Sequence, residues 1–187
     1  MSSAPAESGS ITGIADPRYP IGKFQRPAQI SAAERSSAVE VIRSLPQQLR
    51  SAVANWTNEQ LDTPYRDGGW TVRQLVHHIA DSHGQSSTRL RKALTEDNPT
   101  IQAYNEKLWA DLPDDREAPV EFSLTLLEGV HARWAYLLDH LSEEQWQRTF
   151  QHPESGPWTI DAVTQLYAWH SRHHLAHITE LAKARGW

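Results

Sequence analysis

The chain of 187 residues carries a formal net charge of −5 at pH 7 and contains ten histidines and no cysteine. The acidic balance argues against binding to a nucleic-acid backbone. The lack of cysteine excludes disulfides and thiolate ligands, so a transition-metal site would use histidine and carboxylate. No apolar run is long enough to cross a bilayer, and the first ten residues lack the pattern of a signal peptide. We therefore expect a soluble cytoplasmic protein with neither a membrane nor a nucleic-acid partner.

The N-terminal part of the chain is expected to differ from the rest. Residues 1–17 are rich in Ser, Ala, Gly and Pro, a composition typical of a disordered tail. Residues 18–29 carry Pro and Gly around Tyr19 and Phe24, which predicts an extended segment attached by apolar side chains. We expect residues 18–187 to form a single domain.

The first two long helices have clear start signals. Ser31 precedes a helical apolar pattern, and Pro46 inside that pattern should kink or split the helix near Ser44. Thr71 opens a second helix, which ends before Pro99.

Two further helices are predicted downstream of a polar, proline-containing connection at residues 98–120. The third spans about residues 123–141 and the fourth residues 159–184, with a loop at residues 148–157 between them. Because no sustained period-two alternation appears, we expect no sheet.

The two halves of the chain repeat the same order of features. Thr57-Asn-Glu-Gln-Leu is matched 85 residues later by Ser142-Glu-Glu-Gln-Trp, and Gly69-Trp-Thr-Val is matched 88 residues later by Pro157-Trp-Thr-Ile. The sequence therefore predicts an all-α fold, an antiparallel up-and-down four-helix bundle with pseudo-twofold helix pairs.

Histidines at helical spacing predict a metal site. His170 and His174 are four residues apart on the apolar stripe of the last helix, where two imidazoles are costly to bury without partners. His78 lies on the second helix, which holds the equivalent place in the other half. Three neutral imidazoles with one open coordination position are typical of catalytic zinc. We predict that His78, His170 and His174 bind one metal ion.

Other side chains leave alternatives open. His173 and His177 form a second pair four residues apart, either as a rival ligand set or as groups lining the cavity. We assign His173 and Asp81 as candidate acid–base residues. His77 is expected to face outward, and the role of His83 stays open. Three scattered histidines are expected to be exposed: His131, His140 and His152.

Several motifs resemble a known family. The runs Tyr19–Gly22, Leu61–Gln74, His77–His83 and Trp169–Leu181 are similar to the YfiT-like metal-dependent hydrolases of the DinB-like superfamily, and the similarity extends over residues 18–187. This resemblance implies a four-helix bundle, a homodimer and one divalent metal per subunit, usually zinc. It places the metal ligands at His78, His170 and His174.

The resemblance leaves the reaction open. The first expectation is a zinc-dependent hydrolase that holds water at the open coordination position and acts on a small molecule. Some relatives resemble metal-dependent transferases that join a low-molecular-weight thiol, such as bacillithiol, to an electrophile. A third reading is a non-catalytic bundle that binds a small ligand. Nickel or another divalent ion would also suit an all-histidine site.

Overall fold

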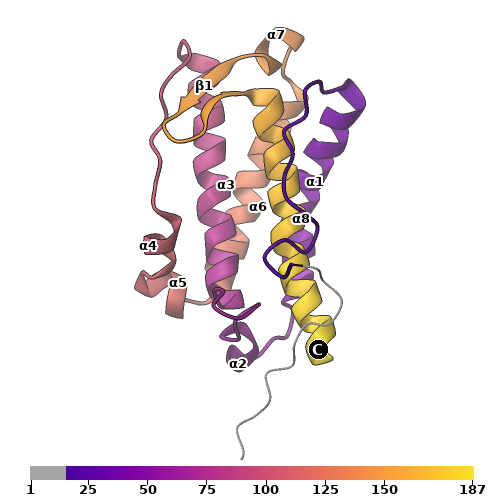
Figure 1. The fold of residues 1–187 in the computed structure, drawn as a ribbon, viewed down its shortest axis with the longest axis vertical. Coiled ribbons are helices and arrows are strands. Elements are labelled where there is room, and N and C mark those ends of the chain that lie inside the picture. Colours follow the sequence, from indigo (N-terminus) through magenta and orange to yellow (C-terminus); the bar gives the residue numbers. More distant parts are fainter. Residues whose placement is uncertain (1–15) are drawn as a thin grey trace, which may run out of the picture.

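The computed structural model describes residues 16–187, which form a bundle of four long helices (Figure 1). These are α1 (Ala32–Ala52), α3 (Val72–Thr95), α6 (Val120–Asp139) and α8 (Ile160–Arg185). Four short helices lie in the connections: α2 (Asn58–Leu61), α4 (Glu106–Ala110), α5 (Pro113–Glu117) and α7 (Glu143–Trp146). The predicted all-α four-helix bundle is confirmed. Apart from its last two residues, the predicted tail at residues 1–17 lies outside the described residues.

Side-chain caps begin the helices where the sequence predicts. The Thr71 hydroxyl accepts a hydrogen bond from the backbone N–H of Gln74, whose side chain accepts one from the backbone N–H of Thr71. Such a capping box satisfies N–H groups that have no partner in the first turn of a helix. Ser31 caps α1 in the same way, and Thr57 and Ser142 cap the equivalent short helices α2 and α7.

Helix α1 continues through Pro46. The sequence left a kink or a split open at this position, and the structure shows no split, because α1 is one helix from Ala32 to Ala52. Its inner side chains Ile42, Leu45 and Leu49 are at most 1% exposed, so packing within the bundle holds the helix together around the proline. Proline has no N–H, so the carbonyl of Ile42 lacks its usual helical donor.

The connectivity of the bundle differs from a simple up-and-down order. Around the bundle axis each helix contacts two others, in the order α1, α8, α3, α6. His77 and His83 of α3 contact Ser123 and His131 of α6 respectively, so these two neighbouring helices run in parallel. The reason is the connection at residues 96–119, which returns along the bundle from the end of α3 to the start of α6 (Figure 1).

A short hairpin precedes α8. Strands β1 (Thr149–His152) and β2 (Gly156–Thr159) pair antiparallel, with Phe150 opposite Trp158. The expectation of a loop at residues 148–157 and of no sheet is therefore wrong. Strands of four residues are too short for a sustained alternation, and within β1 only Phe150 is buried.

The interior has two apolar clusters with a polar layer between them. One cluster includes Leu75 and Leu127, and the other includes Leu90 and Trp134. Between them along the four helices lies a layer of buried polar side chains: Ser82, His83, Ser86, His131 and Ser171. Buried polar groups need hydrogen-bond partners, so this layer constrains how the helices meet.

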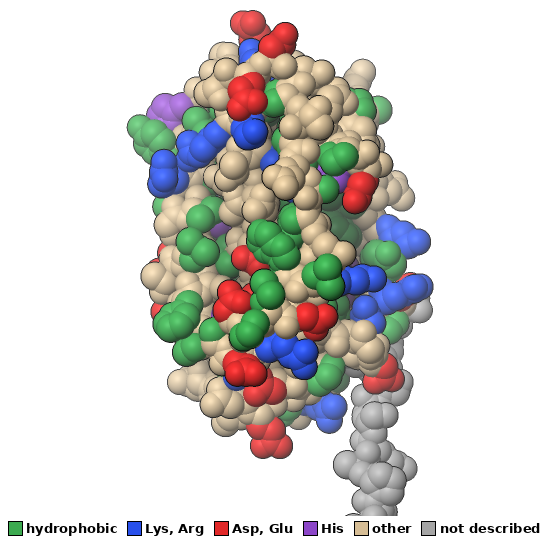
Figure 2. Space-filling model, turned by 90° about the vertical axis from the view of Figure 1, so that its left-hand side faces the viewer, with side chains coloured by type: hydrophobic (Ala, Val, Ile, Leu, Met, Phe, Trp, Pro, Cys, Tyr) green, Lys and Arg blue, Asp and Glu red, His purple; other side chains and the backbone are tan. Residues whose placement is uncertain are grey.

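Two further features concern the surface on one side of the bundle and the hydropathy of its helices. Seen from the side of α4 and α5, it mixes apolar, acidic and basic side chains (Figure 2). Among residues 16–187, no helix combines the length and the hydropathy that a membrane span requires.

Candidate metal centre

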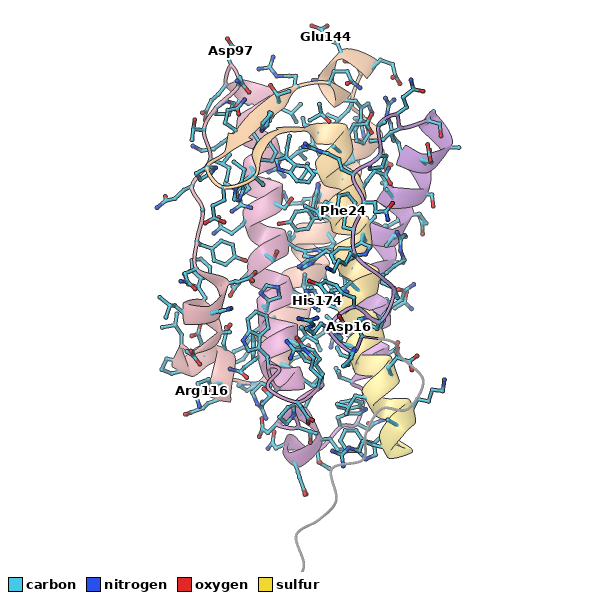
Figure 3. The ribbon with its side chains drawn as sticks, viewed as in Figure 1. Asp16, Phe24, Asp97, Arg116, Glu144 and His174 are labelled. Atoms are coloured by element: carbon cyan, nitrogen blue, oxygen red, sulfur yellow. The ribbon has the colours of Figure 1, made fainter. Side chains whose placement is uncertain are left out.

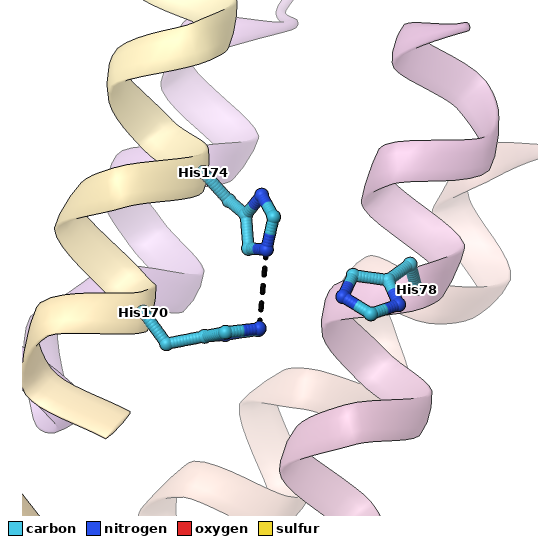
Figure 4. Close-up of side chains that lie close together, drawn as sticks. All are labelled: His78, His170 and His174. Atoms are coloured by element: carbon cyan, nitrogen blue, oxygen red, sulfur yellow. Dashed lines mark hydrogen bonds between the residues drawn. The ribbon is translucent and has the colours of Figure 1, made fainter. Parts of the chain in front are cut away.

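The three predicted metal ligands meet between α3 and α8. His78 and His174 are 4% and 7% exposed, and His170 is partly buried. One nitrogen of each ring lies within 4.8 Å of the other two. The Nε2 atoms of His170 and His174 are 3.1 Å apart and face the ring of His78 across the gap between the helices (Figure 4). The structure therefore brings this trio together, while its role as a ligand set stays a prediction.

Burial keeps these imidazoles neutral. Desolvation lowers the pKa of His78 to about 4. It also lowers the pKa of His170 and of His174 well below the ordinary value, and the neighbouring rings would add repulsion if they were charged. Neutral imidazole is the form that binds a metal ion. At pH 7 the cluster therefore presents lone pairs and not positive charge.

The His170 and His174 nitrogens have a spacing that suits a tetrahedral ion. Two nitrogens bound at the Zn–N distance typical of histidine would lie ~3.3 Å apart. The Nε2 atoms of His170 and His174 are 3.1 Å apart, and the Nδ1 atom of His174 has no hydrogen-bond partner in the described chain. His78 supplies the third nitrogen from the opposite helix. Three donors leave a fourth position free for a small molecule.

The rival histidines form a second cluster that shares His174. One nitrogen each of His173, His174 and His177 lies within 4.8 Å of the other two. The ring of His173 stacks on Trp169 at 4.4 Å, and the ring of His177 packs on Tyr65 at 4.2 Å. Both alternatives left open by the sequence therefore remain, a ligand set or a wall beside the first cluster.

A chain of hydrogen bonds leads from His170 into the polar layer. Its Nδ1 atom is 3.0 Å from Nε2 of His83, and Nδ1 of His83 is 2.9 Å from Nε2 of His131. Nδ1 of His131 in turn donates to the carbonyl of Ile42. The sequence leaves the role of His83 open, and the structure places its ring beside the predicted ligand His170.

The expectation that His131 is exposed is wrong, because this side chain is 1% exposed. The sequence held a signal for its burial, since His131 follows Leu127 by four residues and precedes Trp134 by three on the inward stripe of α6. His140 is exposed as expected, and His152 is partly buried.

The expectation that His77 faces outward is also wrong, because it is 4% exposed. Its Nδ1 atom accepts a hydrogen bond from the Ser123 hydroxyl at 2.7 Å, and its Nε2 atom donates to the Ala118 carbonyl at 3.2 Å. The outer face of α3 has the polar pattern of a solvent face, but α5 and α6 cover it. His77 therefore points away from the cluster at His78.

The candidate acid–base residue Asp81 is partly buried on α3, the helix against which α5 packs. Burial, together with the charge of Asp114, raises the pKa of its carboxyl to about 6. Burial beside Asp81 likewise raises the pKa of Asp115 to about 7, and one carboxyl oxygen of Asp115 has no partner among the described residues. Sequence reasoning missed Asp115, which lies in a segment without a helical pattern.

The candidate acid–base residue His173 borders the cluster on α8. Burial lowers its pKa to about 4, and its Nδ1 atom has no hydrogen-bond partner in residues 16–187. The N-terminal segment passes over this part of α8 (Figure 3), with Tyr19 6.0 Å from the His173 ring and the Trp169 indole donating to the Gly22 carbonyl. This segment and Trp70, whose ring lies 4.7 Å from His78, border the site.

Comparison with known proteins adds a family context. Residues 42–178 match the family model described as the DinB superfamily. A protein of Oceanobacillus iheyensis named "Putative metal-dependent hydrolase" is 49% identical over 170 residues, covering 91% of this chain and 98% of its own. A protein of the same name from Bacillus cereus is 49% identical over 172 residues, covering 92% and 99%.

A solved structure is similar over nearly the same length. YfiT from Bacillus subtilis superposes with a TM-score of 0.89 at 46% identity, covering 91% of this chain and 98% of that one. It is described as a probable metal-dependent hydrolase with an unusual four-helix bundle topology.

Metal content tests the ligand set. Because His170 and His174 converge on one point, we expect His170→Ala and His174→Ala each to lose most of the bound metal, measured per chain by elemental analysis of untagged protein. The matched control is His140→Ala, which removes an exposed histidine and should keep the wild-type content. Because both clusters contain His174, the other ligands distinguish them: if His173→Ala and His177→Ala lose the metal while His78→Ala and His170→Ala keep it, the second cluster holds the ion.

The lowered histidine pKa values predict a pH dependence of the metal-free protein. Between the unfolded pKa of about 6.5 and the folded pKa of about 4 for His78 and His131, the unfolded chain binds protons that the folded chain does not. Their contribution to the free energy of unfolding is therefore complete above pH 6.5 and is lost as the pH falls toward 4. Each group removes up to about 1.4 kcal/mol of unfolding free energy per pH unit in that window.

The measurement is urea unfolding at pH 7 and pH 5 with a chelator present. Asp81 and Asp115 act in the opposite direction because their pKa values are raised. A variant therefore isolates one histidine, and His131→Gln should lose less stability than the wild type between the two pH values. Equal losses in both proteins would contradict the lowered pKa of His131.

Proposed function

The chain belongs to the DinB superfamily, and from this membership we propose that it is a zinc-dependent hydrolase of a small molecule, with one ion per subunit held by His78, His170 and His174. The observation that carries the proposal is the convergence of three neutral imidazoles from two facing helices, with the Nε2 atoms of His170 and His174 3.1 Å apart. A site of three protein donors keeps one coordination position for water or substrate.

A bound zinc ion would supply a Lewis acid and lower the pKa of water in the open position to about 7. The chain's own side chains would do the rest. Three neutral ligands leave the full charge of the ion at the reacting centre. Within residues 16–187 the Nδ1 atom of His173 has no hydrogen-bond partner and can accept a proton, and Trp70 offers an apolar wall against His78.

A second candidate function is transfer of a low-molecular-weight thiol to an electrophile. The chain has no cysteine of its own, so a thiolate would have to come from a substrate. Arg66 favours this alternative, because its charge acts on His177 beside the cluster and would attract an anionic thiol, while one of its N–H groups donates to the Asp67 carbonyl. Arg73, by contrast, is 5% exposed and its guanidinium is occupied by Asp62 and Asn58.

Two assays separate these functions. For the hydrolase we expect turnover of an aryl ester or amide panel without thiol, loss of turnover on chelation and its return with added zinc. For the transferase we expect consumption of monochlorobimane only when bacillithiol is present. In either case His78→Ala should abolish the activity, whereas His140→Ala should keep it. Tight zinc binding with no turnover in both assays would favour a non-catalytic ligand-binding bundle instead.

We also propose that the protein assembles as a homodimer through the outer face of α6. Phe122, Leu126 and Tyr136 are 68%, 52% and 66% exposed, and their spacing places them on one side of the helix. Gly129 lies in the middle of this stripe with open space around it, so a second helix can approach closely. An exposed apolar stripe of this kind is typical of a protein interface.

Molar mass in solution tests the dimer. Wild-type protein should have twice the 21.2 kDa chain mass by light scattering. Phe122→Glu places a charge in the stripe and should shift the protein toward the monomer. The control Leu108→Glu changes an equally exposed leucine on α4 and should stay dimeric. A monomeric wild type, or a dimer unaffected by Phe122→Glu, would refute this interface.

A further inference from the structure

The hydrogen-bond chain through the polar layer has only one possible direction. A backbone carbonyl oxygen only accepts hydrogen bonds, so His131 must carry its proton on Nδ1 to donate to Ile42. A neutral imidazole has one N–H, so Nε2 of His131 is an acceptor. His83 must then donate to it from Nδ1, across 2.9 Å.

The direction of these hydrogen bonds also fixes the tautomer of His170 in the candidate metal centre. With its proton on Nδ1, His83 has a bare Nε2 atom, which accepts a hydrogen bond from Nδ1 of His170 across 3.0 Å. His170 therefore carries its proton on Nδ1 and presents a bare Nε2 atom. That atom is the one that faces Nε2 of His174 in the predicted ligand set (Figure 4).

This direction of the hydrogen-bond chain requires neutral imidazole rings, and burial keeps them neutral. His83 is fully buried and His131 is 1% exposed. A protonated ring would place a donor against a donor in the chain, so the low-dielectric layer keeps each ring in a single neutral tautomer.

The hydrogen-bond chain begins at the backbone beside Pro46. In an uninterrupted helix the carbonyl of Ile42 would accept from the N–H of residue 46, and proline has none. Ile42 is fully buried, and a buried carbonyl needs a partner. His131 of α6 supplies it, so the proline in α1 creates the acceptor that orients every ring that follows.

We propose that His83 and His131 are positioning residues for His170. Their hydrogen bonds connect His170 to the Ile42 carbonyl, which Pro46 leaves without a helical donor, and thereby fix Nε2 of His170 as its metal-binding atom. This inference rests on the proposed role of His170 as a ligand. Outer hydrogen bonds commonly fix the tautomer and ring orientation of a ligating histidine. Here two further imidazoles extend that support to the backbone of a different helix. Within the described residues His170 has this support, whereas Nδ1 of His174 has no hydrogen-bond partner.

Paired substitutions at His131 test the donor-to-acceptor direction of the hydrogen-bond chain. The amide of His131→Gln can donate to Ile42 and accept from His83, whereas the side chain of His131→Leu can do neither. We expect His131→Leu to weaken zinc binding by about 10–100-fold in a chelator competition. His131→Gln should stay closer to the wild type, and His140→Leu, on the exposed end of the same helix, should match it. Circular dichroism verifies that each variant is folded.

The tautomers can also be read directly in the wild-type protein. Long-range ¹H–¹⁵N spectra of metal-free protein should show His83 and His131 protonated on Nδ1, and zinc should shift Nε2 of His170. Equal zinc affinity for His131→Leu and His131→Gln, or protonation of His83 on Nε2, would overturn the proposal. A wild type that binds no zinc would refute the proposed function, and the Nδ1 protonation of His83 and His131 would still decide the direction of the chain.

Discussion

The need to satisfy neutral imidazoles in a dry interior constrains the whole bundle. His83 and His131 lie at the level where the two apolar clusters separate, and each of their ring nitrogens has a partner. Their hydrogen bonds require α1, α3, α6 and α8 to meet at one level. An interior made only of leucine and isoleucine would tolerate sliding of one helix along another, whereas this layer fixes their relative positions.

The parallel direction of α3 and α6 serves the same requirement. Because α3 and α6 run in parallel, His77 and His83 on one helix meet Ser123 and His131 on the other at matching heights. The opposite edge of α3 then faces α8, where His78 meets the pair on that helix. One helix therefore serves the structural polar layer on one side and the candidate metal centre on the other.

The parts of this arrangement that could be predicted from the sequence are those that are local along the chain. Capping boxes at Ser31 and Thr71 and the spacing of His170 and His174 depend on neighbours within four residues. The burial of His77 depends on α5 and α6, which cover a face that has no apolar stripe of its own. The inward position of His131 was readable from the stripe of α6, but its partner Ile42 is set by which helices become neighbours.

Pro46 has a consequence for how the chain folds. An isolated α1 would lack one internal hydrogen bond and would be a weaker helix than its length implies. The missing bond is replaced only when α6 is in place, because His131 reaches Ile42 from that helix. Formation of α1 is thereby tied to the assembly of the bundle. This long-range dependence should make folding more cooperative, since α1 and α6 each complete a buried group of the other.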